Sequence, residues 1–177
     1  WRAWPAVETV QLNGVCSQVI APAPKVDQDQ ALEIAESIAA ELSVTGVMAV
    51  EMFQTKDGEL LINELAMRPH NSGHFTIDGS VTSQFEQHLR AVLDLPLGLT
   101  DLTSEVSVMV NLLGTEKGTD FLENFADVMY RFPEAKIHTY GKSPRPGRKM
   151  GHITVVGEDL ETVRSRPQLE APVISGS

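Results

Sequence analysis

One predicted hairpin restricts the fold of this chain more than any other stretch. Two apolar runs, Val47–Phe53 and Glu59–Leu65, flank a polar turn that contains Asp57-Gly58. Asp-Gly between apolar runs is a strong hairpin signal, because a type I′ turn requires a positive φ at both central residues. The segment is therefore predicted to form two antiparallel strands, and a turn centred on Asp57-Gly58 determines which residues face each other across them.

The facing residues expected from that turn are Lys56 with Glu59, Met52 with Asn63, and Glu51 with Glu64. Two carboxylates in facing positions have Cβ atoms about 5 Å apart and repel each other. Apolar neighbours suggest that both are buried, which raises the cost of ionisation. Mg²⁺ between them would reverse the sign of the interaction, and it commonly shares its remaining positions between water and substrate phosphates. The alternative is a solvated hairpin face that carries two glutamates.

Polar residues suited to anion binding follow the second strand at once. They are interleaved with Pro69 and Gly73, so the run is too polar and too rigid for a core strand. We interpret it as a loop that holds an anion through the side chains of Arg68, His70, Asn71 and His74.

Composition excludes several classes of function. The 177 residues are 42% hydrophobic and 21% charged, which is typical of a globular protein with room for one medium domain or one and a half small ones. The net charge of −10 argues against general binding of nucleic acid or of an anionic membrane, and the chain lacks the run of about 18 apolar residues that a transmembrane helix needs. The single Cys16 indicates a reducing cytoplasm and is expected to be a buried thiol. Because the chain begins at Trp1 rather than Met, we interpret it as a piece of a longer protein.

The segments before the hairpin are predicted from turn residues and periodicity. Strands over residues 6–10 and 14–20 surround Asn13-Gly14, a second hairpin signal. Asp27 is expected to cap a helix that runs to about Leu42 and packs through its apolar face.

After the anion loop, Ser80 or Thr82 is expected to cap a helix over Gln84–Leu93. A polar, turn-rich stretch then places a domain boundary near Thr100. The residues of this helix that are expected to face inward are Phe85, Leu89, Val92 and Leu93.

The second domain is predicted to mix strands and short helices. Strict alternation over residues 106–112 favours a half-buried strand, and two more strands are expected over residues 136–140 and 152–156. Helices are expected over residues 119–129 and 159–164, and residues 166–177 are expected to be a disordered tail. In the first of these helices the residues expected to face inward are Leu122, Phe125, Ala126 and Met129.

A basic loop lies between the last two predicted strands. Four cations fall within residues 142–149 of an otherwise acidic chain, among glycines and prolines that limit their directions: Lys142, Arg145, Arg148 and Lys149. Such a loop suits a phosphate by charge and by bidentate hydrogen bonding, although a solvated basic turn is the alternative. Neither phosphate-loop motif, GxxxxGK[ST] or GxGxxG, is present. The metal pair, the anion loop and the basic loop together describe a ligase that activates a small acid with ATP.

Two motifs carry a family resemblance. The run NELAMRPHNSGH at residues 63–74, followed by SQFEQHLRA at 83–91, looks like the C-terminal half of the ATP-grasp fold. Together with YGK at 140–142 and RPGRKMGH at 145–152, it resembles the 5-(carboxyamino)imidazole ribonucleotide synthases, over roughly residues 4–157. The implied fold class is α+β: the C-terminal part of an ATP-grasp domain at residues 1–99, an antiparallel sheet with packing helices, and a small α/β C-terminal domain at 100–165. The resemblance places the N-terminal lobe and the glycine-rich lid upstream of Trp1, so this piece alone is expected to be inactive.

The resemblance implies an activity in de novo purine biosynthesis. The family uses ATP, with Mg²⁺, to carboxylate aminoimidazole ribonucleotide with bicarbonate through carboxyphosphate, releasing ADP and phosphate. Its members are often dimers, so a homodimer is allowed. The implied roles are Glu51 and Glu64 as Mg²⁺ ligands, Asn63 and Glu64 in the ATP site, Arg68, His70 and Asn71 on bicarbonate and then carboxyphosphate, and Lys142, Arg145, Arg148 and Lys149 on the ribonucleotide phosphate.

Two positions depart from the wider pattern, and two alternatives stay open. Ala66 stands where the superfamily often has Asn in E-x-N-x-R, a difference typical of the purine branch. By the same resemblance, Gln11 stands where relatives often have a His near the nucleotide, which argues against an ATP contact by this residue. The alternatives are another ATP-grasp carboxylate–amine ligase, either the formate-using purine enzyme or a biotin-carboxylase type, and a non-catalytic nucleotide-binding module.

Overall fold

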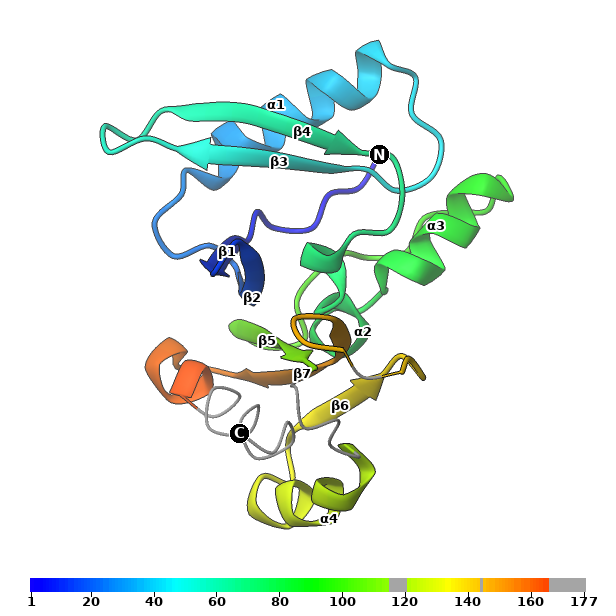
Figure 1. Ribbon diagram of the computed structural model, residues 1–177. Helices are drawn as coiled ribbons and strands as arrows, with labels where there is room; N and C mark the ends of the chain where they lie inside the picture. The colour runs from blue at the N-terminus through cyan, green and yellow to red at the C-terminus, as the bar shows by residue number, and fades with distance from the viewer. Residues whose placement is uncertain (115–120, 144, 166–177) are drawn as a thin grey trace. The chain divides into compact units, whose positions relative to one another are not determined.

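The computed structural model describes residues 1–114, 121–143 and 145–165, which form two compact units (Figure 1). The first unit comprises Trp1–Glu8 and Ala21–Thr103, and the second comprises Thr9–Ile20 and the described residues from Ser104 onward. Residues 9–20, which the sequence analysis grouped with the first 99, belong to the second unit because their strands join its sheet.

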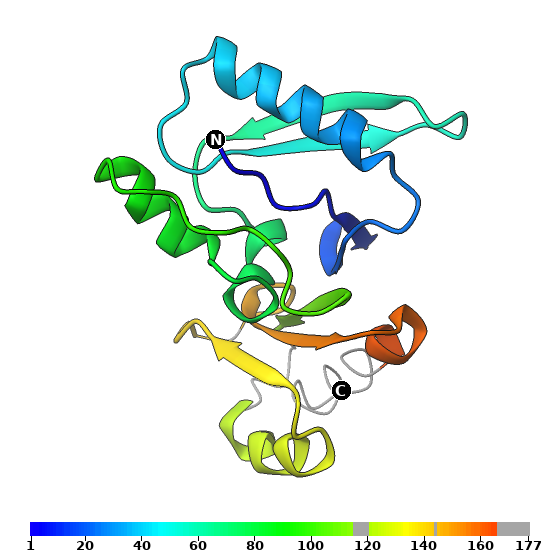
Figure 2. The ribbon, with the colours of Figure 1, turned by 180° about the vertical axis from the view of Figure 1, so that it is seen from behind.

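In the first unit a long helix accompanies the hairpin. Helix α1 (Gln28–Glu41) begins after Asp27, whose side chain accepts a hydrogen bond from the Gln30 N–H at 3.1 Å, and ends at the C-cap Leu42. Both ends agree with the prediction. Seen from behind in Figure 2, α1 lies along one face of the hairpin strands β3 (Ala49–Gln54) and β4 (Leu60–Ala66).

The hairpin turn differs from the predicted type I′ turn. The Thr55 N–H donates to the Glu59 carbonyl at 2.9 Å, and the Gly58 N–H donates to the Thr55 carbonyl at 3.1 Å. Of the two expected central residues only Gly58, with φ of 90°, is left-handed. The loop is therefore a three-residue connection whose glycine relieves the strain, and Thr55 rather than Lys56 faces Glu59.

A β-bulge in the strands restores the predicted carboxylate pair. The register shifts between Glu51 and Met52, so Met52 faces Ile62 and not Asn63. Asn63 is the extra residue that a bulge inserts into one strand. Because the bulge offsets the longer loop, Glu51 faces Glu64 as expected, whereas the expected pairs of Lys56 and Met52 were wrong.

Beyond β4 the chain forms three short helices: η1 (Asn71–Gly73), α2 (Thr76–Gly79) and α3 (Gln84–Val92). Ser83, not Ser80 or Thr82, caps α3, and its hydroxyl accepts a hydrogen bond from the Glu86 N–H at 3.2 Å. The expected orientation of this helix was also wrong. Its buried residues are Gln84 and Gln87, because both amides find backbone partners inside the unit, whereas the exposed fractions run from 41% to 64% for Phe85, Leu89, Val92 and Leu93.

The second unit is built on a five-stranded sheet of order β1-β2-β5-β7-β6. Its strands are β1 (Glu8–Leu12), β2 (Val15–Ala21), β5 (Val106–Leu113), β6 (Lys136–Thr139) and β7 (Lys149–Gly157). The predicted hairpin turn at Asn13-Gly14 has φ of 51° and 77°, the two positive values of a type I′ turn. Strand β5 is buried on both faces rather than half-buried, because it is the central strand between β2 and β7.

Among the described residues of the second unit, one helix and one helical turn accompany the sheet. Helix α4 (Phe121–Arg131) buries Val128 in the core and packs Phe125 against it, but leaves Ala126 and Met129 exposed, so the expected inward face was partly wrong. The side chain of Leu122 and the tail 166–177 lie outside the described residues. The buried core of this unit is Ile20, Val108, Val110, Leu112, Val128, Ile153, Val155 and Val163.

The ends of the second unit depart in small ways from the sequence expectations. Residues 160–165 are helical. Hydrogen bonds from the Thr162 side chain and from the Thr162 N–H, the latter at 2.8 Å, lower the pKa of the Asp159 carboxyl. Cys16 is partly rather than fully buried. In the part of the chain that the structure describes, each helix is too short or too polar to cross a membrane.

Candidate functional site

The two facing glutamates differ in their surroundings. Because facing residues of an antiparallel pair lie on the same side of the sheet, Glu51 and Glu64 share one face of the hairpin. Glu64 is exposed, and the Glu51 side chain is 38% exposed, so the expected burial of both was wrong. Among the described residues the side chain of Glu64 makes no hydrogen bond or ion pair, which leaves its carboxylate oxygens available to a cation.

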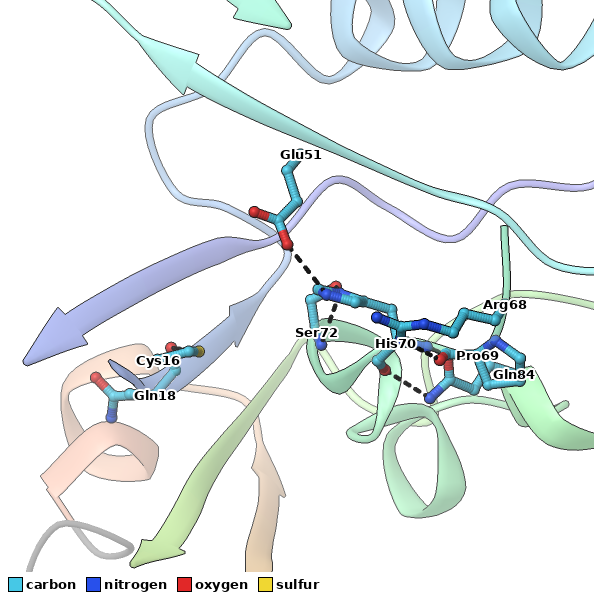
Figure 3. Close-up of polar contacts among 8 residues, drawn as sticks. All are labelled: Cys16, Gln18, Glu51, Arg68, Pro69, His70, Ser72 and Gln84. Atoms are coloured by element: carbon cyan, nitrogen blue, oxygen red, sulfur yellow. Dashed lines mark hydrogen bonds and ion pairs between the residues drawn. The ribbon is translucent and has the colours of Figure 1, made fainter. Parts of the chain in front are cut away.

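Glu51 contacts the anion loop through His70. The Oε1 atom of Glu51 lies 3.0 Å from Nε2 of His70 (Figure 3). The other ring nitrogen, Nδ1, accepts the Ser72 N–H at 3.3 Å and lies 2.8 Å from the Ser72 hydroxyl. Because Nδ1 is an acceptor there, the neutral ring carries its proton on Nε2 and donates it to Glu51. The structure thus joins two residues that the sequence analysis had assigned to different ligands.

The remaining candidates of the first unit lie next to this pair. Arg68 is exposed directly after β4, and its Nη1 donates to the carbonyl of Pro69 at 3.1 Å, which uses one of the five guanidinium donors. Asn71 begins the 3-10 helix η1, and Asn63 is exposed at the bulge beside Glu64.

The carboxylates suit magnesium better than a transition metal. Among the residues the structure describes, no three or more His, Cys, Asp or Glu side chains come together in a way that could hold a metal ion. Mg²⁺ is usually bound by one or two carboxylates, with water and substrate phosphates in its other positions. The facing pair Glu51 and Glu64 therefore fits a magnesium ion that arrives with a nucleotide.

Gln84, which the sequence analysis did not single out, hydrogen-bonds to the backbone of the anion loop. Its side-chain amide is buried and bonds to the backbone of His70 on both sides, as Figure 3 shows. The sequence did offer a signal: two glutamines, Gln84 and Gln87, lie three positions apart on this helix. A search for apolar periodicity does not consider polar residues, so it does not detect this signal.

In the second unit the basic loop is anchored to β5. The Gly114 N–H donates to the Arg148 carbonyl at 2.8 Å, and the Gly147 N–H donates to the Gly114 carbonyl at 3.0 Å. A Cβ atom on Gly114 would collide with the carbonyl oxygen of Arg145. Residues 145–148 of the loop are therefore held against the backbone of Gly114.

The cations of this loop differ in exposure. Lys142 is exposed, with Nζ 4.9 Å from the centre of the Tyr140 ring and 3.4 Å from the carbonyl of Lys149. Nη1 of Arg148 donates to the Ser143 carbonyl at 3.1 Å. Arg145 is exposed, and Lys149 is partly buried. The four cations that the sequence analysis named thus lie on one hairpin loop or at its base.

Sequence reasoning also missed the polar network behind this loop. The hydroxyl of Tyr140 lies 2.7 Å from Nδ1 of His152, whose ring stacks on His138 at a centroid distance of 4.7 Å. Burial raises the pKa of Tyr140 to about 12, because the phenolate is harder to solvate there. The Tyr140 hydroxyl therefore stays protonated near neutral pH.

Two family models match the chain: the ATP-grasp domain over residues 1–85, and the phosphoribosylaminoimidazole carboxylase C-terminal domain over residues 107–166. The N5-carboxyaminoimidazole ribonucleotide synthase of Mycobacterium tuberculosis is 53% identical over 98% of this chain and 42% of its own length. The protein of the same name from Bacillus subtilis is 51% identical over 85% of this chain and 39% of its own length.

Solved structures agree with these matches. The crystal structure of N5-carboxyaminoimidazole synthase from Aspergillus clavatus, in complex with ADP and 5-aminoimidazole ribonucleotide, matches with a TM-score of 0.87 and 38% identity, over 98% of this chain and 48% of that one. The synthetase from Thermus thermophilus matches with a TM-score of 0.84 and 41% identity, over 98% of this chain and 46% of that one. The chain thus spans less than half the length of these relatives.

Proposed function

The chain belongs to the N5-carboxyaminoimidazole ribonucleotide synthase family of ATP-grasp ligases, and from that premise we propose that it forms part of an enzyme that carboxylates 5-aminoimidazole ribonucleotide. The reaction takes bicarbonate and ATP and releases ADP and phosphate. One observation carries the proposal: facing carboxylates, Glu51 and Glu64, stand beside an Arg- and His-bearing loop, and His70 of that loop touches Glu51.

The hairpin face is the proposed nucleotide site. Glu51 and Glu64 would hold Mg²⁺, and Asn63, exposed at the bulge beside Glu64, would contact ATP. When bound, Mg²⁺ offsets negative charge on the phosphoryl group being transferred. The protein's part is to present both carboxylates on one side of a short hairpin, where repulsion between them favours a cation.

The anion loop is the proposed carboxylate site. Arg68, His70 and Asn71 would bind bicarbonate and then carboxyphosphate, with charge and hydrogen-bond donors directed at the oxygens where negative charge accumulates. Carboxyphosphate decomposes readily in water, so the site must exclude water, and a loop of fixed geometry suits that need. The Nε2 proton of His70, held toward Glu51, would remain beside the proposed metal site.

The basic loop of the second unit is the proposed ribonucleotide phosphate site. Lys142 and Arg148, helped by Arg145 and Lys149, supply the positive charge and planar donors that phosphate oxygens prefer. Two family models, one for each part of the chain, support a division into residues 1–99 for nucleotide chemistry and 100–165 for a C-terminal domain, to whose unit residues 9–20 add two strands. We place the enzyme in the cytoplasm, acting on small molecules, and propose a homodimer as its assembly.

The test measures ADP formation by the full-length enzyme with aminoimidazole ribonucleotide, supplied with either bicarbonate or formate. We expect ADP release that requires both the ribonucleotide and bicarbonate, with one N-carboxylated product per ADP. Turnover with formate in place of bicarbonate would instead assign the chain to another ATP-grasp ligase. Nucleotide binding without turnover under any of these conditions would make it a binding module.

A further inference from the structure

We propose that Gln84 is a positioning residue of the anion loop, which holds the backbone of His70 and selects the tautomer of His74. The kinetic consequence of this inference rests on the proposed function, whereas its structural consequence does not. Gln84 is the first residue of α3 and is only 2% exposed, although glutamine is usually found at the surface.

The Gln84 amide pairs with both backbone groups of one residue. Oε1 accepts the His70 N–H at 2.8 Å, and Nε2 donates to the His70 carbonyl at 2.8 Å. Exchange of both bonds with one residue is what a neighbouring strand does in an antiparallel sheet. His70 is extended, with φ of −122° and ψ of 154°, as such pairing requires. The side chain of Gln84 therefore takes the place of a strand and fixes the direction from which the His70 ring reaches Glu51.

The same amide determines which nitrogen of His74 carries a proton. Because the His70 N–H requires an acceptor, Oε1 and Nε2 of Gln84 cannot be exchanged. Nε2 is then a donor to His74 Nδ1, 2.8 Å away, so neutral His74 has its proton on Nε2. The His74 ring also stacks on Phe85, the next residue of α3, at a centroid distance of 5.6 Å. Two successive residues of one helix thus orient this ring.

Gln84 has little freedom to leave this position. Its own N–H donates to the Thr76 hydroxyl at 2.9 Å, and that hydroxyl donates to the Gly73 carbonyl at 2.6 Å. A Cβ atom at Gly73 would lie 2.5 Å from Gln84 Oε1, so only glycine leaves room for the amide. A buried amide or backbone group without its partner is costly. The loop is therefore held in one arrangement.

Gln87 provides a matched control on the same helix. It is 3% exposed, and its amide makes the same two-way pair with a backbone residue: Nε2 donates to the Gly98 carbonyl at 2.9 Å, and Oε1 accepts the Gly98 N–H at 2.8 Å. Gly98 lies after α3 and outside the anion loop. Replacement of either glutamine by Met thus removes an equivalent pair of backbone hydrogen bonds, but only replacement of Gln84 releases His70 and the His74 ring.

The kinetic experiment compares Gln84→Met with Gln87→Met in the full-length enzyme. We expect Gln84→Met to lower kcat about ten- to a hundred-fold, as is typical when a group that orients a reacting side chain is lost, with KM for the ribonucleotide unchanged. Gln87→Met should leave kcat at the wild-type value despite a similar loss of thermal stability. Equal losses of kcat in the two variants, or an unchanged kcat in Gln84→Met, would overturn the proposal.

A spectroscopic experiment separates positioning from support of the fold and needs no turnover. With ¹⁵N-labelled histidine in the full-length enzyme, the His74 ring should show a protonated Nε2 and a bare Nδ1, assigned by the loss of its signals in His74→Asn. In Gln84→Glu, a carboxylate faces Nδ1 and should draw the proton there. A wild-type ring protonated on Nδ1, or the same tautomer in both proteins, would contradict the inference. If the tautomer changes in Gln84→Glu but the wild-type enzyme does not carboxylate the ribonucleotide, the positioning role of Gln84 is supported and the proposed function is refuted.

Discussion

Replacement of Glu64 by Gln in the full-length enzyme distinguishes a metal ligand from a structural residue. Glu64 is exposed and faces Glu51 across the hairpin. Two unit charges about 5 Å apart in a water-like surrounding repel each other by about 0.8 kcal/mol, and salt reduces that value. We therefore expect the free energy of unfolding of Glu64→Gln in metal-free buffer to equal the wild-type value or to exceed it by up to about 1 kcal/mol.

Replacement of Glu51 by Gln removes the same repulsion but should leave the protein less stable than Glu64→Gln does. Its carboxylate lies 3.0 Å from Nε2 of His70, so the change turns a charge-assisted hydrogen bond into a weaker neutral one. Because the pair is partly exposed, we expect Glu51→Gln to be less stable than Glu64→Gln by about 0.5–1 kcal/mol. If the proposed Mg²⁺ site is right, both variants should lose turnover by about a hundred-fold or more, since each would remove a ligand of the ion that offsets charge on the transferred phosphoryl group.

The assay is urea denaturation in EDTA and again with Mg²⁺ and ADP, together with initial rates. Ligand at a hundred times its Kd stabilises the protein that binds it by about 2.7 kcal/mol. The wild type should gain stability from Mg²⁺ and ADP, and Glu64→Gln should gain much less. The reasoning fails if Glu64→Gln is as strongly stabilised by Mg²⁺ as the wild type, or if it is clearly less stable than the wild type in EDTA.

Three further results follow from the structure. Gly58→Ala should destabilise the hairpin by about 1–2 kcal/mol, because φ is 90° there. Asp57→Ala should change stability by less than about 0.5 kcal/mol in urea denaturation. Equal losses of stability in the two variants would indicate a type I′ turn instead. Lys142→Ala should raise KM for the ribonucleotide about ten- to a hundred-fold with KM for ATP unchanged, and the exposed Lys136→Ala should raise neither. Since burial raises the pKa of Tyr140 from 10.0 to about 12, the stability that comes from its neutral form is present below pH 10 and is lost as pH rises towards 12. Tyr140→Phe should lack that part of the decline in unfolding free energy, and identical pH profiles would argue against it.

The predicted carboxylate pair was confirmed although the turn behind the prediction was wrong. A three-residue loop moved the register by one position, and a bulge at Asn63 moved it back. Strand pairing is restricted by which face of the hairpin is apolar, so an irregularity near the turn is compensated further along. The residues of a turn therefore predict the presence of a hairpin more reliably than they predict the type of its turn.

The predicted inward face of α3 failed for a different reason. Helical spacing of Phe85, Leu89 and Val92 indicates an apolar stripe, but it does not say whether anything covers that stripe. In the structure the helix instead buries Gln84 and Gln87, because backbone groups of His70 and Gly98 satisfy their amides. Apolar periodicity has no means of detecting such polar partners, since they come from other segments of the chain.

Short-range chemistry was sufficient for the parts that depend on near neighbours: the cap at Asp27, the left-handed turn at Asn13-Gly14, and the motifs that identify the family. Tertiary structure alone decided that Glu51 meets His70, that Gln84 supports the anion loop, and that β5 is central in a sheet whose other strands come from both ends of the chain. A turn or a cap is specified within a few residues by backbone strain and local hydrogen bonds. The partner of a side chain is chosen by whichever distant segment packs against it.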